Sequence, residues 1–355
     1  MFVDNALQDH SATVARKVLK RGLSNLNALL QEIYGSSDVT YVACPDFSIT
    51  LRKERLALGF PIGGYLNFGS CSFVPLDLMI NTCGVHMIRL GTDFEVNSFR
   101  TSLRALKTRM ESQKMIVDDI PLRWNFSKRN HFINIYKDEV SGEHYAIFHG
   151  ASETKLCNWD YLNDEFEIEK RQVNGYEVRY LINENAEKYY SIAQKENDFF
   201  YKSHKVILNE IMPLGGEIVF SDFHFGVINK GEFLMGCSKI PIGTDFPLLT
   251  SPFNSVFIAT AKEPKESIRN LFGDDYTLVP HGLGMTLNED IVDILPDSFN
   301  PDYLSLVSKS GCVMHTNQVE HGGYSYRTHE QIEEIASKGV IELKKELIPL
   351  YNIKI

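Results

Sequence analysis

Cysteine and histidine side chains at predicted strand ends and glycine turns are the residues of this sequence best suited to chemistry. Cys83 stands before a glycine, and five histidines occupy similar positions: His86, His131, His149, His224 and His281. Imidazole and thiolate are ligands that borderline metals such as Zn²⁺ and Mn²⁺ accept, with the thiolate favouring the softer metal. The spacings are long and match no compact zinc signature. These residue types alone therefore leave open both a metal site, including that of a zinc hydrolase, and ordinary hydrogen-bonded histidines.

The cysteine count and the first residues bear on the compartment. Six cysteines in 355 residues are too few for a disulfide scaffold, and the absence of a C-x-x-C pair excludes zinc-ribbon and thioredoxin classes. The first ten residues contain two acids and lack the apolar segment of a signal peptide. No stretch approaches the roughly 18 apolar residues of a membrane span. We expect a cytoplasmic protein in a reducing compartment, with no membrane partner.

The net charge of −10 argues against a general polyanion binder, but the charge is unevenly distributed. Residues 1–130 carry a net charge of +4, and the remainder of the chain carries −14. The basic residues gather in clusters at Arg16, Lys17, Lys20 and Arg21; at Arg52, Lys53 and Arg55; at Arg100, Arg104, Lys107 and Arg109; and at Lys128 and Arg129. Such clusters form either a groove that follows phosphates or solvated helix faces, and charge alone leaves both open.

Apolar periodicity and turn residues predict the elements that position these side chains. Helices are expected over residues 97–116, 185–212, 329–345 and 11–34, the last entered through Ser11 or Thr13 and ended by Gly35. Strands are expected near residues 39–44, 62–68, 85–90, 131–136, 144–149, 217–221, 232–236 and 254–260. The strands at 131–136 and 144–149 are expected to pair around a turn from Asp138 to Gly142.

Short strands mixed with long helices indicate an α+β fold, a mixed α/β architecture with central β-sheets and flanking helices. The sequence contains no internal repeat and no Pro-, Gly- or Ser-rich linker. We therefore expect a single compact domain over residues 1–355, with a basic helical region over about residues 1–45 at its N-terminal end.

Seven short segments occur in the order in which similar motifs occur in one enzyme family. They are GFPIGG at 59–64, INTCGV at 80–85, NHFI at 130–133, IFHGAS at 147–152, DFH at 222–224, HGLG at 281–284 and PLYNIKI at 349–355. In this order they resemble the RtcB family of GTP-dependent RNA ligases. No single tetrapeptide is specific, but seven collinear segments cover nearly the whole chain, so the resemblance implies an RtcB-like domain.

The resemblance implies a definite reaction. RtcB ligases use GTP and manganese to join RNA that ends in a 2′,3′-cyclic phosphate or 3′-phosphate to RNA that begins with a 5′-hydroxyl. Carried over position by position, His281 is the nucleophile that forms a covalent histidine–GMP. The implied metal ligands are Cys83, His131, His149 and His224, and the implied nucleotide contacts are Asn130, Gly282, Gly284 and Lys354. The implied partners are GTP, RNA with broken or spliced ends such as tRNA, and an activating protein.

The residue types suit that chemistry. Attack at a phosphorus that carries several negative charges needs cations beside it, which a metal site supplies. Neutral imidazole is a competent nucleophile near pH 7, because its pKa lies close to that value. Glycines beside His281 allow the backbone to approach a nucleotide closely. The basic clusters would then give RNA phosphates a place to bind.

The sequence departs from the family pattern at several positions. The acidic metal ligand three residues before the family's cysteine falls on Ile80, and Asn134 and Met285 replace an acid and an arginine of neighbouring motifs. Asp77 is an acid that a backbone bulge would have to bring to the position of Ile80. A lost carboxylate weakens one of two metal positions, so we expect one or two Mn²⁺ ions.

Two hypotheses follow. The first is a divergent RNA ligase of RNA repair or tRNA splicing, favoured by His281 within HGLG. The second is a non-ligating metal-binding relative that acts as an RNA-end binder or assembly partner, favoured by the lost acid. A different nucleotidyl-transfer or phosphoesterase reaction at the same metal site is a further alternative.

Overall fold

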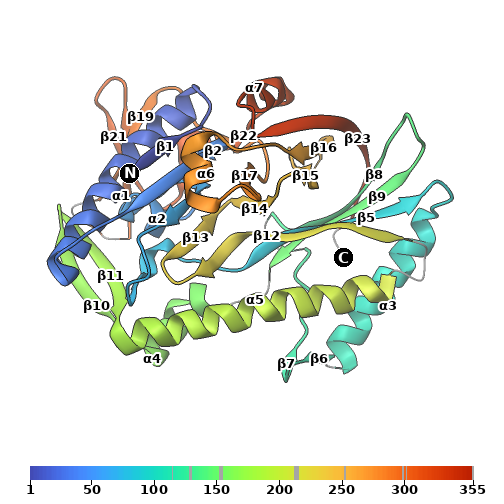
Figure 1. Ribbon diagram of the computed structural model, residues 1–355, viewed down its shortest axis with the longest axis horizontal. Helices are drawn as coiled ribbons and strands as arrows, with labels where there is room; N and C mark the ends of the chain where they lie inside the picture. The colour runs from blue at the N-terminus through green and yellow to red at the C-terminus, as the bar shows by residue number, and fades with distance from the viewer. Residues whose placement is uncertain are drawn as a thin grey trace.

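A mixed β-sheet runs through the middle of the molecule and carries several of the candidate residues (Figure 1). The computed structural model describes residues 1–113, 115–127, 130–151, 155–211, 216–251, 253–297, 300 and 302–353. The strands of this sheet are Phe2–Asp4 (β1), Thr40–Ser48 (β2), Ile62–Asn67 (β3), Cys83–Gly91 (β5), Phe132–Lys137 (β8), His144–Ala151 (β9), Glu217–Asn229 (β12), Glu232–Met235 (β13), Asp245–Leu248 (β15), Val256–Ala261 (β16) and Ile341–Ile353 (β23). In the part of the chain that the structure describes, they lie in the order β1-β2-β3-β13-β12-β5-β9-β8-β23-β16-β15.

Strands β12, β5, β9 and β8 are consecutive, antiparallel neighbours, and their register aligns residues that are far apart in sequence. Val85 on β5 and Phe132 on β8 both pair with His149 on β9, and Cys83 pairs with Phe225 on β12. Side chains alternate between the faces of a strand, so this register decides which residues share a face. The predicted pairing of strands near 131–136 and 144–149 is confirmed.

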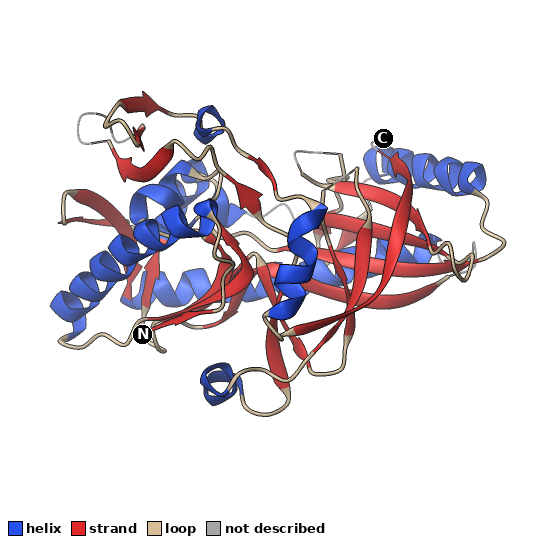
Figure 2. Ribbon diagram, turned by 90° about the horizontal axis from the view of Figure 1, so that it is seen from above, coloured by secondary structure: helices blue, strands red, loops and turns tan. Residues whose placement is uncertain are grey.

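The helices lie around the sheet. They are His10–Tyr34 (α1), Lys53–Leu58 (α2), Val96–Gln113 (α3), Trp159–Glu165 (α4), Asn183–Ile211 (α5), Glu266–Phe272 (α6) and Ile332–Ser337 (α7). Helix α5 runs along the lower edge of the molecule in Figure 1, and strands fill the middle when it is seen from above (Figure 2). The helices predicted over 11–34, 97–116 and 185–212 correspond to α1, α3 and α5.

Helix α1 shows how local residues define an element. Its N-cap is Asp9, whose side chain accepts a hydrogen bond from the Ala12 amide at 2.8 Å. The predicted entry through Ser11 or Thr13 is therefore wrong, because the carboxylate of Asp9 already caps the first turn. Gly35 ends the helix with a φ of 70°, as its position predicts.

Separate apolar clusters hold the helices to the strands. Phe99, Leu103 and Leu106 of α3 pack with Ile88 of β5 and Phe148 of β9 in one cluster, which the end of α5 completes. Another cluster lies between α1, β2 and β3, and extends to β10 (Glu169–Val173) and β11 (Tyr176–Ile182). The basic region predicted over about residues 1–45 is thus part of the main body, because β1 and β2 belong to the central sheet.

Smaller elements complete the fold. Strands β10 and β11 form a sheet with Phe73–Pro75 (β4). Further small sheets among the described residues pair Cys237–Pro241 (β14) with Tyr276–Pro280 (β17), Met285–Thr286 (β18) with Ser325–Tyr326 (β22), and Ile116–Val117 (β6) with Ile120–Pro121 (β7). Another joins Ile291–Pro296 (β19), Leu304–Ser308 (β20) and Val313–Thr316 (β21). Short 3₁₀ helices cover Leu76–Leu78 (η1), Lys155–Cys157 (η2), Val319–Gly322 (η4) and His329–Gln331 (η5).

The helix predicted over residues 329–345 is wrong. The chain forms only η5 and the six-residue α7, turns at Gly339 with a φ of 80°, and enters β23 at Ile341. Strand β23 pairs with β16 on one side and β8 on the other. The hydrogen bonds and burial gained between two strands override the helix propensity of a segment rich in Glu, Leu and Lys.

The prediction of an α+β fold with central sheets and flanking helices in one compact domain is confirmed. Among the described residues, the helices are all too short or too polar to cross a membrane.

Candidate metal centre and nucleophile

The candidate residues come from five separate segments that the sheet brings together. Cys83 begins β5, His149 lies near the end of β9, and His224 lies within β12. His131 directly precedes β8, and His281 directly follows β17. The predicted strand near 217–221 extends in the structure to Asn229, and this extension carries His224 beside the start of β5.

Three of these side chains present ligand atoms to one another. The Sγ of Cys83, a ring nitrogen of His149 and a ring nitrogen of His224 all lie within 4.8 Å of one another. The Cys83 Sγ lies 3.5 Å from His149 Nε2 and 3.6 Å from His131 Nε2. Metal–sulfur and metal–nitrogen bonds of about 2.3 and 2.0 Å at a tetrahedral ion place sulfur and nitrogen about 3.5 Å apart. The spacing therefore fits a thiolate–imidazole metal centre.

Backbone carbonyls orient two of the imidazoles. The Nδ1–H of His149 donates to the carbonyl oxygen of Asn130 at 3.1 Å, and the Nδ1–H of His131 donates to that of Asn125 at 3.1 Å. Such bonds fix the tautomer and leave Nε2 as the ligand atom on the side of Cys83. Asn130 thus serves the cluster through its main chain, and its side chain is exposed. The role of Asn130 in nucleotide binding stays a prediction.

Burial sets the protonation of the cluster in the absence of metal. Burial raises the pKa of the Cys83 thiol to about 12. Burial, together with the charges of neighbouring histidines, holds the pKa values of His149 and His224 well below the ordinary value. The two imidazoles are therefore neutral near pH 7, while the thiol keeps its proton unless a cation replaces it.

His281 lies against this cluster. Its ring stacks on that of His224 with centroids 4.2 Å apart, and its centroid lies 6.2 Å from that of His149. The Nδ1 of His281 lies 3.5 Å from Oδ2 of Asp46, an acid that is 2% exposed. Among the described residues, neither Nδ1 of His281 nor Oδ1 of Asp46 has a hydrogen-bond partner. A buried carboxylate beside Nδ1 is suited to hold the imidazole with Nε2 available for attack.

The two glycines after His281 pack closely against other segments. A side chain on Gly282 would meet the carbonyl oxygen of Leu249 at 2.8 Å, and a Cβ on Gly284 would overlap the carbonyl oxygen of Asp46. Gly284 also has a φ of 80°, which side-chain-bearing residues rarely adopt. These contacts give both glycines a structural role in the His281 loop, and their predicted contact with a nucleotide stays a prediction.

A cavity of about 450 Å³ adjoins the His281 loop. It is lined by Thr250, Phe253, Asn254, Ser255, Thr328, His329 and Pro349. Leu249, which precedes Thr250, exchanges backbone hydrogen bonds with His281 and Leu283, each at 3.0 Å. Lys354, the predicted guanine contact, lies outside the described residues.

Within the described cluster, no carboxylate takes the place of the acidic metal ligand that the RtcB family has at the position of Ile80. Ile80 is buried among apolar side chains. Asp77 is committed elsewhere, because both its oxygens accept hydrogen bonds from Arg179. Asp222 accepts hydrogen bonds from the Tyr201 hydroxyl and the Phe223 amide. The described donors at this site are therefore a thiol and imidazoles.

His86 lies apart from the ligand atoms. It is 1% exposed, stacks on His204 with centroids 4.6 Å apart, and shares a hydrogen bond of 2.8 Å with Ser221. This arrangement favours the structural interpretation of His86.

Most of the basic residues near the N-terminus are engaged within the protein. Arg16 and Arg21 of α1 form ion pairs of 2.7 and 2.8 Å with aspartates, and Arg55 is buried and donates to backbone carbonyls. In α3, Arg109 pairs with a glutamate at 2.5 Å. Residues 128 and 129 lie outside the described part of the chain. These partners favour a structural role for the basic residues of α1 and α2.

Sequence reasoning missed two residues that the fold brings to the site. Asp46 lies 235 residues before His281, in the segment PDFS at 45–48. The first two residues of this segment match a PDVH motif of the RtcB family, and that match could have indicated Asp46. Asn197 of α5 is buried, accepts a hydrogen bond from Thr82 at 2.7 Å and donates to the carbonyl of Val227 at 2.7 Å. It thereby ties the residue before Cys83 to β12, close to His224.

No family model matches the chain, and no curated protein is significantly similar to it in sequence. The resemblance to RtcB ligases consequently stays a prediction that depends on the seven motifs.

Proposed function

We propose that this protein is a divergent RNA ligase that joins a 2′,3′-cyclic phosphate or 3′-phosphate end to a 5′-hydroxyl end through a histidine–GMP intermediate. The observation that carries the proposal is the position of His281. Its ring stacks on His224, which belongs to the cluster of potential metal ligands, and its Nδ1 faces the buried carboxylate of Asp46. A nucleophile, a group that orients it and a site for a cation are the parts that nucleotidyl transfer requires.

The donor set supports binding of a divalent metal such as Mn²⁺. Cys83, His149 and His224, with His131 as a fourth donor, would hold the ion, and the spacing of Cys83 Sγ from two Nε2 atoms suits such a centre. The metal would supply positive charge beside the phosphate oxygens. Because Ile80 replaces the acid, we infer one ion at this site. The thiolate would favour a softer metal over Mn²⁺, so metal identity belongs to the test.

The side chains of this chain then have defined roles in the first step. The Nε2 of His281 attacks the α-phosphorus of GTP, a nitrogen–phosphorus bond forms, and the bond to the pyrophosphate oxygen breaks. Asp46, whose Oδ2 lies 3.5 Å from Nδ1, would accept a hydrogen bond from Nδ1–H after a small approach and would stabilise the positive charge that develops on the ring. The cavity beside Thr250 is the proposed place for the nucleotide, since Thr250 follows Leu249, which is hydrogen-bonded to the backbone of His281 and Leu283.

A 2′,3′-cyclic phosphate end must first add water, which breaks the bond from phosphorus to the 2′-oxygen and leaves a 3′-phosphate and a 2′-hydroxyl. Two further transfers then complete the proposed reaction. An oxygen of the RNA 3′-phosphate attacks the phosphorus of histidine–GMP, which releases His281. The 5′-hydroxyl oxygen of the second RNA then attacks the 3′-phosphate, GMP leaves, and a phosphodiester forms. Both are displacements at phosphorus in which positioning and charge stabilisation provide the catalysis.

The test is guanylylation of the purified protein. It is incubated with Mn²⁺ or Zn²⁺ and GTP labelled at the α-phosphate, and covalent label is measured after denaturation. We expect label in the native protein and in His315→Ala, a control histidine that is 51% exposed on β21, and none in His281→Ala. Bound metal is counted in all three proteins, and His281→Ala should keep it, because Cys83 and the other donors are unchanged.

A labelled native protein is next given RNA with 3′-phosphate and 5′-hydroxyl ends, and formation of a joined product is measured. Absence of label in a metal-loaded native protein would refute the ligase. The alternative is then a metal-binding relative that recognises RNA ends without joining them, which the buried Ile80 favours. That alternative requires RNA binding that depends on the phosphorylated end.

A further inference from the structure

We propose that Arg327 is a positioning residue for the His281–Asp46 pair, with Asp9 as its counter-ion. The inference rests on the proposed role of His281 as nucleophile. Its structural basis is one buried guanidinium that joins three segments of the chain: the start of α1, the end of β2 and the His281 loop.

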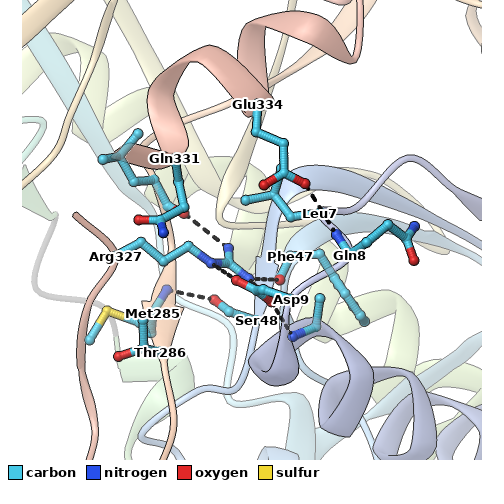
Figure 3. Close-up of polar contacts among 12 residues, drawn as sticks. Leu7, Gln8, Asp9, Phe47, Ser48, Met285, Thr286, Arg327, Gln331 and Glu334 are labelled. Carbon is cyan, nitrogen blue, oxygen red and sulfur yellow. Dashed lines mark hydrogen bonds and ion pairs between the residues drawn. The ribbon is translucent and has the colours of Figure 1, made fainter. Parts of the chain in front are cut away.

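The side chain of Arg327 is 0% exposed, and that of its partner Asp9 is 26% exposed. Its Nε and Nη2 donate to the two carboxylate oxygens of Asp9 at 2.6 and 3.0 Å. Its Nη2 also donates to the carbonyl oxygen of Phe47 at 3.0 Å, and its Nη1 to that of Leu283 at 3.0 Å. Figure 3 shows the guanidinium beside Asp9 and Phe47. Only the planar fork of arginine provides donors in these directions at once.

Two of these acceptors flank the residues that must meet. Phe47 follows Asp46 directly, and Leu283 lies two residues after His281. The distance of 3.5 Å between Asp46 Oδ2 and His281 Nδ1 therefore spans the two segments that Arg327 joins. A shift of either segment changes this distance, and a displacement of about 1 Å is enough to slow a positioned reaction by about two orders of magnitude.

Neighbouring contacts reinforce the same junction. The Arg327 amide donates to the carbonyl of Gly284 at 3.1 Å, and the Met285 amide donates to Ser48 Oγ at 3.0 Å (Figure 3). Gly284 packs against the carbonyl of Asp46 so closely that no side chain fits. The loop and the end of β2 are thus held together by the bond from the Met285 amide to Ser48 and by the close packing of Gly284, and Arg327 ties both to Asp9.

The Arg327 guanidinium with its bonds to Asp9, Phe47 and Leu283, called the clamp below, is linked to α1 through Asp9. Its Oδ1 caps the helix by accepting from the Ala12 amide while its two oxygens face Arg327. Replacement by asparagine keeps an oxygen for the cap and removes the charge. Arg16 provides a matched control, since it also pairs with an aspartate, Asp4, through Nε and Nη2 and donates to a carbonyl, but that carbonyl belongs to Leu7.

The experiment compares Arg327→Met, Arg327→Lys, Asp9→Asn and the control Arg16→Met in single-turnover guanylylation at a range of GTP concentrations. We expect the maximal rate constant to fall at least tenfold in Arg327→Met, with the half-saturating GTP concentration changed less than twofold. Arg327→Lys should recover only part of the rate, because lysine lacks the planar fork. Asp9→Asn should slow labelling about threefold, and Arg16→Met should leave the rate constant unchanged. A merely structural role would lower the labelled fraction and not the rate constant.

A second measurement is independent of GTP chemistry. Nitrogen-15 spectra of labelled histidine rings in the zinc-loaded protein report which nitrogen of His281 carries the proton. We expect the Nδ1–H tautomer in the native protein and in Arg16→Met, and a mixture of tautomers in Asp9→Asn and in Arg327→Met if it folds. If the native protein takes up no label from GTP but the variants show this tautomer change, the ligase proposal is refuted and the clamp is supported. An unchanged His281 signal in Asp9→Asn and in a folded Arg327 variant, or an unchanged labelling rate in both, would overturn the clamp.

Discussion

Metal binding is expected to release one proton, and that proton comes from Cys83. Burial raises the pKa of this thiol to about 12, so the metal-free protein keeps it protonated at pH 7. The pKa values of His149 and His224 are held well below the ordinary value, so these ligands carry no proton that the metal must displace. A metal requires the thiolate and the neutral imidazoles, and among Cys83, His149 and His224 only the thiol must change its protonation.

The magnitude follows from this proton count. Since metal and proton compete for the Cys83 sulfur, affinity rises tenfold per pH unit, or about 1.4 kcal/mol, over the range below the thiol pKa. Metal at one hundred times its dissociation constant stabilises the folded state by about 2.7 kcal/mol. An unfolding entropy of about 2.1 cal/mol/K per residue then gives an increase in Tm of about 4 °C for a chain of 355 residues.

The assay is calorimetric titration of the metal-free protein with Zn²⁺ in two buffers that differ in ionisation enthalpy, at pH 6.5 and 7.5. The native protein and Cys71→Ala, which alters a half-buried thiol elsewhere, should release one proton more than Cys83→Ala. Comparison with Cys83→Ala also removes any contribution from metal-bound water. Equal proton release in the native protein and Cys83→Ala would refute the thiolate ligand. A difference of one proton with a further proton released by both proteins at pH 6.5 would refute the neutral state assigned to the imidazoles.

The other expected outcomes concern stability and metal count. Gly284→Ala should lower the free energy of unfolding by about 3 kcal/mol or more, because strain at positive φ adds to overlap with the carbonyl oxygen of Asp46. The control Gly243→Ala, with a φ of 83° and open space around it, should lower this free energy by only about 1 kcal/mol. Urea unfolding of the two variants and the native protein measures both values. Burial lowers the pKa of His204 from 6.5 to about 4. The stabilisation of the folded state by the neutral imidazole is therefore complete above pH 6.5, and about 3 kcal/mol of it is lost as the pH falls to 4. His204→Phe should remove this part of the pH dependence of the free energy of unfolding. Ile80→Asp should lower the Tm of the metal-free protein, because it buries a carboxylate among apolar side chains. Elemental analysis of the metal-loaded variant should show a second ion. An unchanged metal count would contradict the alignment of Ile80 with the family's acid.

The elements around the candidate site were largely predictable from local pattern. Apolar spacing located α1, α3 and α5, and short apolar runs located β5, β8 and β9. The segment after Gly339 was not predictable in this way. Its Glu, Leu and Lys residues favour a helix, while its strand conformation depends on β16 and β8, which are distant in sequence. Pairing partners of this kind are invisible to a local window.

The residues of the candidate site likewise fall into those that the sequence predicted and those that it did not. Cys83, His149 and His224 were selected by residue type and motif, and the structure brings them together because β5, β9 and β12 are neighbours in the sheet. Asp46 was indicated only by the two residues that its segment shares with a family motif, and Arg327 carried no usable signal, since an arginine in a polar stretch is ordinary in any sequence. Their relation to His281 exists only across separations of 235 and 46 residues.

The two parts of the site are held by different kinds of structure, and this suits what each must do. The potential metal ligands lie in or beside strands whose ladders are fixed on both sides, and Nδ1 of His149 is tied to a backbone carbonyl. The sheet sets the backbone positions of these ligands, so little backbone ordering remains to oppose binding of an ion. His281 lies on a loop that the buried Arg327 holds through a main-chain carbonyl. A nucleophile that bonds to phosphorus and then releases it needs small adjustments of its ring against fixed neighbours. A loop held beside a rigid sheet by a few hydrogen bonds permits such adjustments, whereas a position inside the ladder would not.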